Sequence, residues 1–167
     1  MDTEIVTERL RLRRSRPEDL EAMHALASDW EVVKQTATWP WPPDRAFTAT
    51  RAKPMSPKSG MAGPVFAGRE LVGMIGVTAA DTGAELGYMF ARAHWGRGFA
   101  TEIGRALVAH AFATFDWRSI TACVFDENPG SARVLEKLGF SETGRCSGPS
   151  AAQGRALPMR TFRRTRG

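Results

Sequence analysis

The chain has 167 residues, a length that suits one compact domain over residues 1–167. Hydrophobic residues make up 43% of it and charged residues 25%, which excludes a disordered, collagen-like or disulfide-dependent chain. No apolar run approaches the roughly 20 residues that a membrane helix requires, and the first residues lack the basic and apolar pattern of a secretory signal. We therefore expect a cytoplasmic protein that makes no membrane contact.

The net charge of +5 has a local origin. Five of the 23 Lys and Arg residues lie in segment 155–167, which has no acidic residue, and the other 18 match the 18 Asp and Glu residues in number. The sequence therefore predicts a balanced body with a basic C-terminal strand or tail, which disfavours nucleic acid as a partner. The two cysteines, Cys123 and Cys146, lack CxxC spacing, so we expect buried or reduced thiols and no bound metal.

The N-terminal third combines extended and helical patterns. Ile5–Arg13 has the period-two alternation of a half-exposed strand. Pro17 and the two acidic residues after it favour the start of a helix. The buried stripe of this helix is predicted at Leu20, Met23, Leu26 and Ala27. Segment 35–63 is broken by prolines and predicts irregular structure, except for a short helix from Asp44 to Arg51.

Three antiparallel strands are predicted in the middle of the chain, because turn residues separate apolar runs at hairpin spacing. They cover Val65–Ala67, Leu71–Thr78 and Ala84–Phe90. A glycine-containing loop then leads into a helix. Its apolar positions are Ile103, Leu107, Val108, Ala111, Phe112 and Phe115.

The C-terminal third predicts a strand, a helix and a final strand. Ile120–Phe125 is typical of a buried strand. Asn128 is a good N-cap and Pro129 suits the first helical position, so we expect a helix from there to Leu138, which ends at a glycine in the left-handed conformation. The last strand is predicted at Ala156–Arg163.

The loop Gly96-Arg97-Gly98-Phe99-Ala100-Thr101 resembles a phosphate cradle, because glycines allow successive main-chain N–H groups to converge on an anion at the start of a helix. It is not a mononucleotide P-loop, since no Lys-Ser/Thr pair follows its last glycine. It does not match a dinucleotide-binding loop either, because Thr101 occupies the position of the third small residue. A purely structural tight turn is the alternative.

Three further segments accompany this loop and together resemble the GCN5-related N-acetyltransferase (GNAT) superfamily, with most similarity to its RimJ/RimL-like branch. They are Thr7-Glu8-Arg9-Leu10-Arg11-Leu12-Arg13, Ala84-Glu85-Leu86-Gly87-Tyr88-Met89-Phe90 and the run from Asn128 to Phe140. The resemblance extends from residue 7 to about residue 145. It implies an α+β fold: a mostly antiparallel, V-shaped sheet of six to seven strands, flanked by about four helices.

The resemblance also implies a cosubstrate, acetyl-CoA, and residues that contact it. The pyrophosphate would bind the main chain of Gly96, Gly98, Phe99, Ala100 and Thr101, with Arg97 free to add charge at the rim. The pantetheine arm would pair with the main chain of Met89 and Phe90 like an extra strand. Asn128 matches a coenzyme-contacting asparagine of the family, although its use as an N-cap is an equal alternative.

Catalysis would require a group that removes a proton from the attacking amine, and we assign this role to Glu85. The alternative is that Glu85 is only an exposed residue of the strand or an ion-pair partner. Relatives carry a tyrosine four residues before the Gly-Phe pair to protonate the leaving thiolate, but this chain has Leu135 there. Ser131 or water is the predicted substitute, since a thiol of pKa about 8.5 leaves tolerably well without help.

The sequence therefore predicts direct acetyl transfer to a primary amine, of a protein N-terminus or a small molecule, in a ternary complex. Two alternatives stay open: a catalytically weak acyl-CoA sensor, and a nucleic-acid-binding protein that uses the arginine-rich end. Trp30, Trp39 and Trp41 are assigned either to the acceptor pocket or to the core. A homodimer is one option for the assembly state, and the acceptor itself is not predicted.

Overall fold

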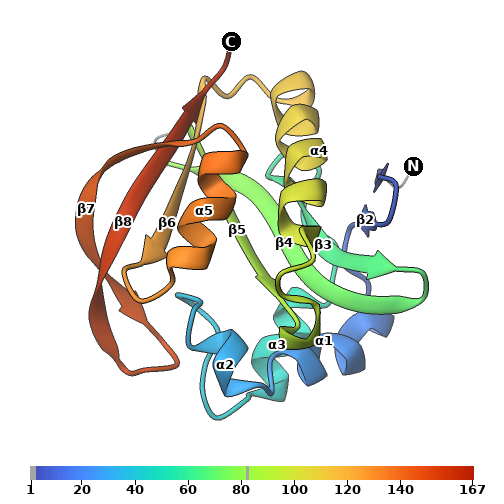
Figure 1. The fold of residues 1–167 in the computed structure, drawn as a ribbon. Helices are drawn as coiled ribbons and strands as arrows, with labels where there is room; N and C mark the ends of the chain where they lie inside the picture. Colours follow the sequence, from blue (N-terminus) through green and yellow to red (C-terminus); the bar gives the residue numbers. More distant parts are fainter. Residues whose placement is uncertain (1–2, 82) are drawn as a thin grey trace.

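A computed structural model describes residues 3–81 and 83–167 and shows a single curved sheet with helices on both faces (Figure 1). The described strands form one eight-stranded sheet in the order β1-β2-β3-β4-β5-β6-β8-β7. Their bounds are β1 Glu4–Val6, β2 Arg11–Arg13, β3 Gly60–Ala67, β4 Glu70–Ala80, β5 Gly83–Phe90, β6 Ser119–Phe125, β7 Ser141–Ser150 and β8 Arg155–Thr165. All neighbouring pairs are antiparallel except β5 and β6, which are parallel.

The helices divide between the two faces of the sheet. Two short 3-10 helices and five α-helices are described: 3-10 helices Pro17–Asp19 and Arg92–His94, α1 Leu20–Leu26, α2 Trp30–Val33, α3 Arg45–Arg51, α4 Phe99–Thr114 and α5 Pro129–Lys137. The main core packs α4 and α5 on one face, against residues such as Leu86 and Ile120. Residues of α1 and α2 pack with Met89 on the other face, because successive strand residues point to opposite faces. None of the described helices is long and apolar enough to cross a membrane.

The central strands β5 and β6 part from each other. Their pairing joins Ala84 to Ile120 and Glu85 to Thr121, and within the described residues it goes no further. Beyond this point β5 continues with β4 to Phe90, whereas β6 continues with β8 (Figure 1). The sheet therefore has the predicted V shape, and we call the region between the diverging main chains of β5 and β6 the opening.

The far ends of the two halves meet again at the tip of the β7–β8 hairpin. The main-chain N–H of Ala151 donates to the carbonyl oxygen of Ala37 over 3.0 Å. The side-chain amide of Gln153 donates to the carbonyl oxygen of Lys34 over 3.1 Å and to the carboxylate of Glu127 over 2.7 Å. The hairpin tip therefore fastens the β6-β8-β7 half to the segment that follows α2.

Several elements differ from their sequence prediction. The single strand expected over Ile5–Arg13 is a hairpin of β1 and β2, because the N–H of Thr7 bonds to the carbonyl of Leu10 and turns the chain. β3 begins at Gly60 instead of Val65 and includes Pro64, which pairs with β4 beyond the end of the short pairing with β2. The helix predicted at 44–51 is confirmed as α3.

β7 was not predicted, and it brings the described sheet to eight strands. Its first seven residues are all exposed, so they lack the alternation of buried and exposed positions that marks a strand in a sequence. Main-chain pairing with β8 along its whole length holds it in place. The final strand, β8, runs from Arg155 to Thr165 and is longer than predicted.

Candidate functional site

The loop before α4 presents main-chain donors toward solvent. Gly96 and Gly98 adopt φ values of 79° and 78°, a left-handed conformation that glycine tolerates and other residues rarely adopt. Gly98 is the N-cap of α4 and provides no side-chain cap, so the first N–H groups of this 16-residue helix are left for another acceptor. The partial positive charge of a helix N-terminus makes that acceptor an anion.

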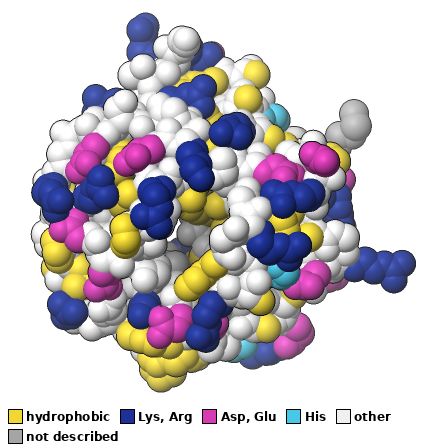
Figure 2. Space-filling model, viewed as in Figure 1, with side chains coloured by type: hydrophobic (Ala, Val, Ile, Leu, Met, Phe, Trp, Pro, Cys, Tyr) yellow, Lys and Arg dark blue, Asp and Glu magenta, His cyan; other side chains and the backbone are white. Residues whose placement is uncertain are grey.

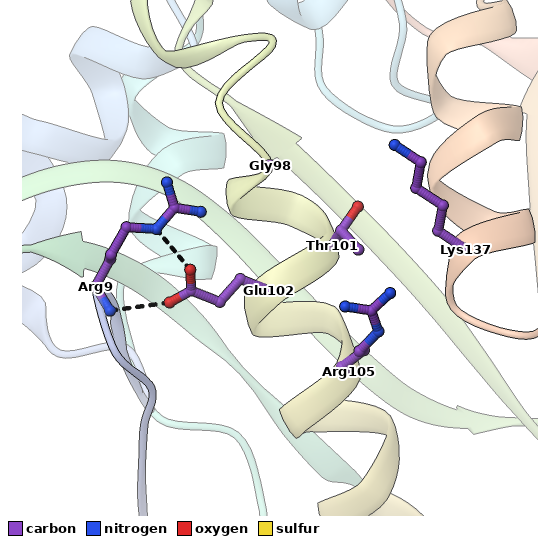
Figure 3. Close-up of a pocket in the computed structure, with 6 residues that line it drawn as sticks. All are labelled: Arg9, Gly98, Thr101, Glu102, Arg105 and Lys137. Carbon is purple, nitrogen blue, oxygen red and sulfur yellow. Dashed lines mark hydrogen bonds and ion pairs between the residues drawn. The ribbon is translucent and has the colours of Figure 1, made fainter.

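A cavity of about 670 Å³ lies beside this loop, and its lining comes from three elements. The six residues that line it are Arg9, Gly98, Thr101, Glu102, Arg105 and Lys137 (Figure 3). Figure 3 shows Thr101 and Arg105 on the side of α4 that faces Lys137 of α5, with Arg9 and Glu102 on its other side. Figure 2 shows the surface hollowed between α4 and α5, with Lys and Arg side chains around the hollow.

Glu102 is bound to the turn between β1 and β2. One carboxylate oxygen accepts from Thr7 Oγ1 over 2.5 Å and from the N–H of Arg9 over 2.9 Å, and the other accepts from Arg9 Nε over 2.7 Å. Burial alone would raise the pKa of Glu102, but these hydrogen bonds outweigh it and lower the pKa. Glu102 therefore stays ionised and compensates Arg9.

Arg105 and Lys137, both exposed, have no partner among the described residues, so the cavity carries net positive charge.

Arg97 is less free than predicted. Its Nη1 bonds to Nδ1 of His94 over 3.0 Å, and its guanidinium lies over the Phe99 ring, 4.8 Å from the centroid. His94 in turn stacks on Phe99 and contacts Glu70 over 2.6 Å. Arg97 thus helps to hold the loop shape, since its guanidinium packs on the first residue of α4. Phe99 itself is buried and can offer only its main chain to a ligand.

Met89 and Phe90 lie on β5 beyond the point where the strands part, and both side chains are buried. Only their main chains can therefore contact a molecule in the opening. The carbonyl of Phe90 accepts from Trp95 Nε1 over 2.8 Å and keeps one free lone pair. Ala100 is half-buried in the first turn of α4.

Tyr88 and Ser131 connect the two sides of the opening. Tyr88 Oη lies 2.5 Å from Ser131 Oγ and 3.3 Å from the carbonyl oxygen of Ser131. Asn128 Oδ1 accepts from the Ser131 N–H over 3.3 Å, so Asn128 does act as the N-cap of α5. Leu135 is 1% exposed within the core, so its position offers no group to the opening.

Glu85 forms the last β5–β6 pair, with Thr121, before the strands separate. It is exposed and makes no hydrogen bond or ion pair with the residues that the structure describes, so the ion-pair alternative finds no support. Because Glu85 and Tyr88 are three positions apart on one strand, their side chains project to opposite faces of the sheet. A molecule between the strands would have the Glu85 carboxylate on one side and the Tyr88–Ser131 pair on the other.

The acetyltransferase (GNAT) domain family matches residues 9–141 of this chain. The chain belongs to the GNAT acetyltransferase family. It is 30% identical to the uncharacterized N-acetyltransferase p20 of Bacillus licheniformis, over 95% of this chain and 93% of that protein. The family prediction from the sequence motifs is thereby confirmed, and acetyl-CoA is the cosubstrate of this family.

Solved GNAT structures share the fold. A GNAT-family acetyltransferase from Bacillus anthracis is similar with a TM-score of 0.79 and 24% identity, over 98% of both chains. RimL, a ribosomal L7/L12 alpha-N-protein acetyltransferase crystallised with coenzyme A, is similar with a TM-score of 0.82 and 19% identity, also over 98% of both chains. The predicted α+β GNAT fold is confirmed by these similarities.

Sequence reasoning did not single out five residues of this candidate site: Arg9, Glu102, Arg105, Lys137 and Tyr88. Thr101 and Arg105 are four positions apart, so the helical period alone places both on one side of α4. The contacts of Glu102 with Thr7 and of Tyr88 with Ser131 join residues 95 and 43 positions apart. No local pattern reveals such pairs. Cys123 and Cys146 were predicted to be buried or reduced; both are free thiols, which agrees with the second alternative, and both are exposed, so burial is wrong. Trp39 lies in the core, whereas Trp41 is partly exposed against Trp30.

Proposed function

We propose that this acetyltransferase holds the pyrophosphate of acetyl-CoA at the main-chain N–H groups from Gly96 to Thr101. The residues present fit that group, since the first turn of α4 lacks a cap and borders a cationic cavity. Arg105 and Lys137 offer two further cations without partners among the described residues, and they suit the remaining phosphate of the coenzyme. Arg9, whose charge Glu102 compensates, adds guanidinium N–H donors that Glu102 orients.

The opening between β5 and β6 accommodates the rest of the cosubstrate in this proposal. Amides of the pantetheine arm would pair with the main chain at Met89 and Phe90, which is not paired to β6 or to another strand on that side among the described residues. One N–H there would also stabilise the thioester oxygen as it gains negative charge. Acetyl-CoA supplies the activated acyl group, and the chain orients it between two rigid strand edges.

The acceptor in this proposal is a primary amine that attacks the thioester directly in a ternary complex. Glu85 is placed to take the amine's proton, directly or through water, because it is exposed at the point where the strands separate. The amine would approach from the face that carries Glu85, opposite α4 and α5. Fold similarity does not select among amines, so a thiol-release screen over N-terminal peptides, aminoglycosides and polyamines would define the acceptor class.

The observation that carries the proposal is the uncapped N-terminus of α4 at the cationic cavity. Calorimetry with acetyl-CoA tests it: we expect saturable binding to the wild-type protein and a loss of about 100-fold or more in Gly98→Asp, because the new carboxylate repels phosphate. Gly68→Asp is the matched control. Gly68 also has positive φ, 62°, and open space around it, but it lies in the β3–β4 turn away from the cavity.

Equal affinities of the two variants, or no saturable binding by the wild type, would contradict the proposal. A catalytically weak acyl-CoA sensor is the second candidate, and the burial of Leu135 at the position of the family's tyrosine favours it. The sensor would bind acetyl-CoA with the same dependence on Gly98 but release no free thiol with any amine in the screen.

A further inference from the structure

The hydrogen bond between Tyr88 and Ser131 spans the opening in which the thioester is proposed to lie. Tyr88 belongs to β5, three residues past the last pairing with β6, and Ser131 lies in the first turn of α5. The two hydroxyl oxygens are 2.5 Å apart. Ser131 lies one helical turn before Leu135, the position at which the family's tyrosine is missing, and Tyr88 adds a second hydroxyl from β5.

The surroundings of Tyr88 restrict what its hydroxyl can do. The ring packs edge-on against Phe90, 6.2 Å between centroids, and belongs to the border of the main core. Among the described residues, both hydrogen-bond partners of the hydroxyl lie on Ser131. Burial raises the pKa of Tyr88 to about 12, with Ser131 opposing the shift. The phenol thus stays protonated at any working pH and is always available as a donor.

The pKa values of the phenol and of the thiol distinguish proton transfer from hydrogen bonding as the role of this pair. A phenol of pKa about 12 would give its proton to a thiolate of pKa about 8.5 only against an equilibrium of some three orders of magnitude. A hydrogen bond to the same thiolate has no such obstacle, and bonds to charged acceptors are the stronger ones. The pair is therefore suited to stabilising the leaving sulfur and unsuited to being its proton source.

We propose that Tyr88 is a positioning residue: its O–H donates to Ser131 Oγ, which leaves the Ser131 proton free to bind the sulfur of CoA as the thiolate departs. The alternative orientation, in which Ser131 donates to Tyr88 and Tyr88 donates to the Ser131 carbonyl, is the closed arrangement without a thiolate. This inference rests on the proposed acetyl transfer and adds to it the means of stabilising the leaving group.

The reaction balances without a proton from either hydroxyl. The amine nitrogen forms a bond to the carbonyl carbon, and the C–S bond breaks with its electron pair going to sulfur. Ser131 donates a hydrogen bond to that sulfur, and Tyr88 donates one to Ser131. The proton lost by the amine passes to Glu85 or water and returns to the thiolate through solvent.

The experiment uses Ser131→Ala, Tyr88→Phe and the double variant, with Ser131→Thr as the conservative control that keeps a hydroxyl. We expect kcat to fall about 30-fold in Ser131→Ala and about 10-fold in Tyr88→Phe, with the Kd of acetyl-CoA unchanged. Because Tyr88 acts through Ser131, the double variant should match Ser131→Ala instead of multiplying the two losses. Ser131→Thr should recover most of the activity.

A binding measurement separates this role from a structural one. For the wild type, the affinity for free CoA should rise about 10-fold as pH passes upward through the range of the thiol, since the thiolate is the form that Ser131 stabilises. This rise should vanish in Ser131→Ala and shrink in Tyr88→Phe. Acetyl-CoA, which has no ionisable thiol, corrects for pH effects that come from the protein itself, including any that act through the charged side chains of Glu85 on β5 and Arg133 on α5.

A Tyr88→Phe variant with wild-type kcat and an unchanged pH dependence of CoA affinity would overturn the inference. A multiplicative loss in the double variant would overturn it too, because the residues would then act independently. Neither result touches the proposed function, which fails instead if wild-type protein does not bind acetyl-CoA. The same calorimeter runs therefore distinguish the two failures.

Discussion

Two regions of this protein are rich in cations and use them in opposite ways. At the start of α4, Arg105 and Lys137 face a cavity without partners among the described residues. Along β8 and just past it, four of the five arginines bond to other groups of the protein. Positive charge near α4 is available to a ligand, whereas most of the positive charge near the C-terminus is already engaged.

Two of the C-terminal arginines, Arg164 and Arg166, serve as helix caps. Arg164 Nη1 donates to the carbonyl oxygen of Leu138, at the end of α5, over 2.8 Å. Arg166 donates to the carbonyls of Phe112 over 2.6 Å and Trp117 over 3.0 Å, and also to that of Phe115, at the end of α4. Such bonds satisfy carbonyls that a helix leaves free and oppose the negative end of its dipole.

This comparison removes the support for a nucleic-acid function. Arg160 is bonded to Glu142 over 2.8 Å, so three of the five arginines in segment 155–167 have defined internal roles. The segment is a strand of the sheet and not a solvated tail. A count of charges in a sequence therefore overstates the charge that a partner can use.

The largest effect is expected where an arginine is most completely paired. Arg13 and Asp19 form a buried pair at 2.8 Å, with Asp19 only 6% exposed. Asp19→Asn should lower the free energy of unfolding by about 3 kcal/mol at neutral pH, because it leaves a buried guanidinium without its counter-charge. Chemical denaturation measures this. Glu21→Gln, which breaks the exposed pair with Arg45, should cost less than about 0.5 kcal/mol.

The same variant gives a pH prediction with a definite sign. Burial alone would raise the pKa of Asp19, but the hydrogen bonds from Arg13 and Arg16 lower it below the ordinary value. The ionised pair then stabilises the fold fully above pH about 4 and loses that contribution as pH falls through the lowered pKa. The stability difference between wild type and Asp19→Asn should shrink on acidification, and a constant difference would contradict the assignment.

A smaller effect is expected at the cavity. The double variant Arg105→Met, Lys137→Met should weaken acetyl-CoA binding about 30-fold in calorimetry, since each cation loses a charge-assisted contact with phosphate. Its unfolding temperature should stay close to that of the wild type, because neither side chain has a partner in the described structure. Unchanged affinity would assign the phosphates to another surface.

The smallest effect is expected for the capping arginines. Arg164→Met, Arg166→Met should lower the free energy of unfolding by about 1–2 kcal/mol, because exposed charge-assisted caps contribute modestly. Acetyl-CoA affinity should not change. The cavity double variant should thus lose affinity and keep its stability, whereas the capping double variant should lose stability and keep its affinity. If both variants lose the same property, the two cationic regions are not functionally distinct.

The sequence predicted those parts of the site that are formed by residues close together in the chain. The glycines around Arg97 and the Asn128-Pro129 start of α5 each depend on a few adjacent residues, and both were found. The Arg9–Glu102 contact and β7 depend on pairing across the fold, and both were missed. Periodicity reports which face of an element is buried, but it cannot report which distant side chain lies opposite a hydroxyl or a carboxylate.

The bonds from the hairpin tip to Lys34 and Ala37 join the two halves of the V-shaped sheet at their far ends. These bonds hold the two halves together without the help of a ligand. A cosubstrate that binds between two halves that are already joined need not bring them together, so less of its binding energy is spent on ordering the protein. Without the bonds of Gln153, each cosubstrate molecule that binds would have to order the two halves of the sheet itself.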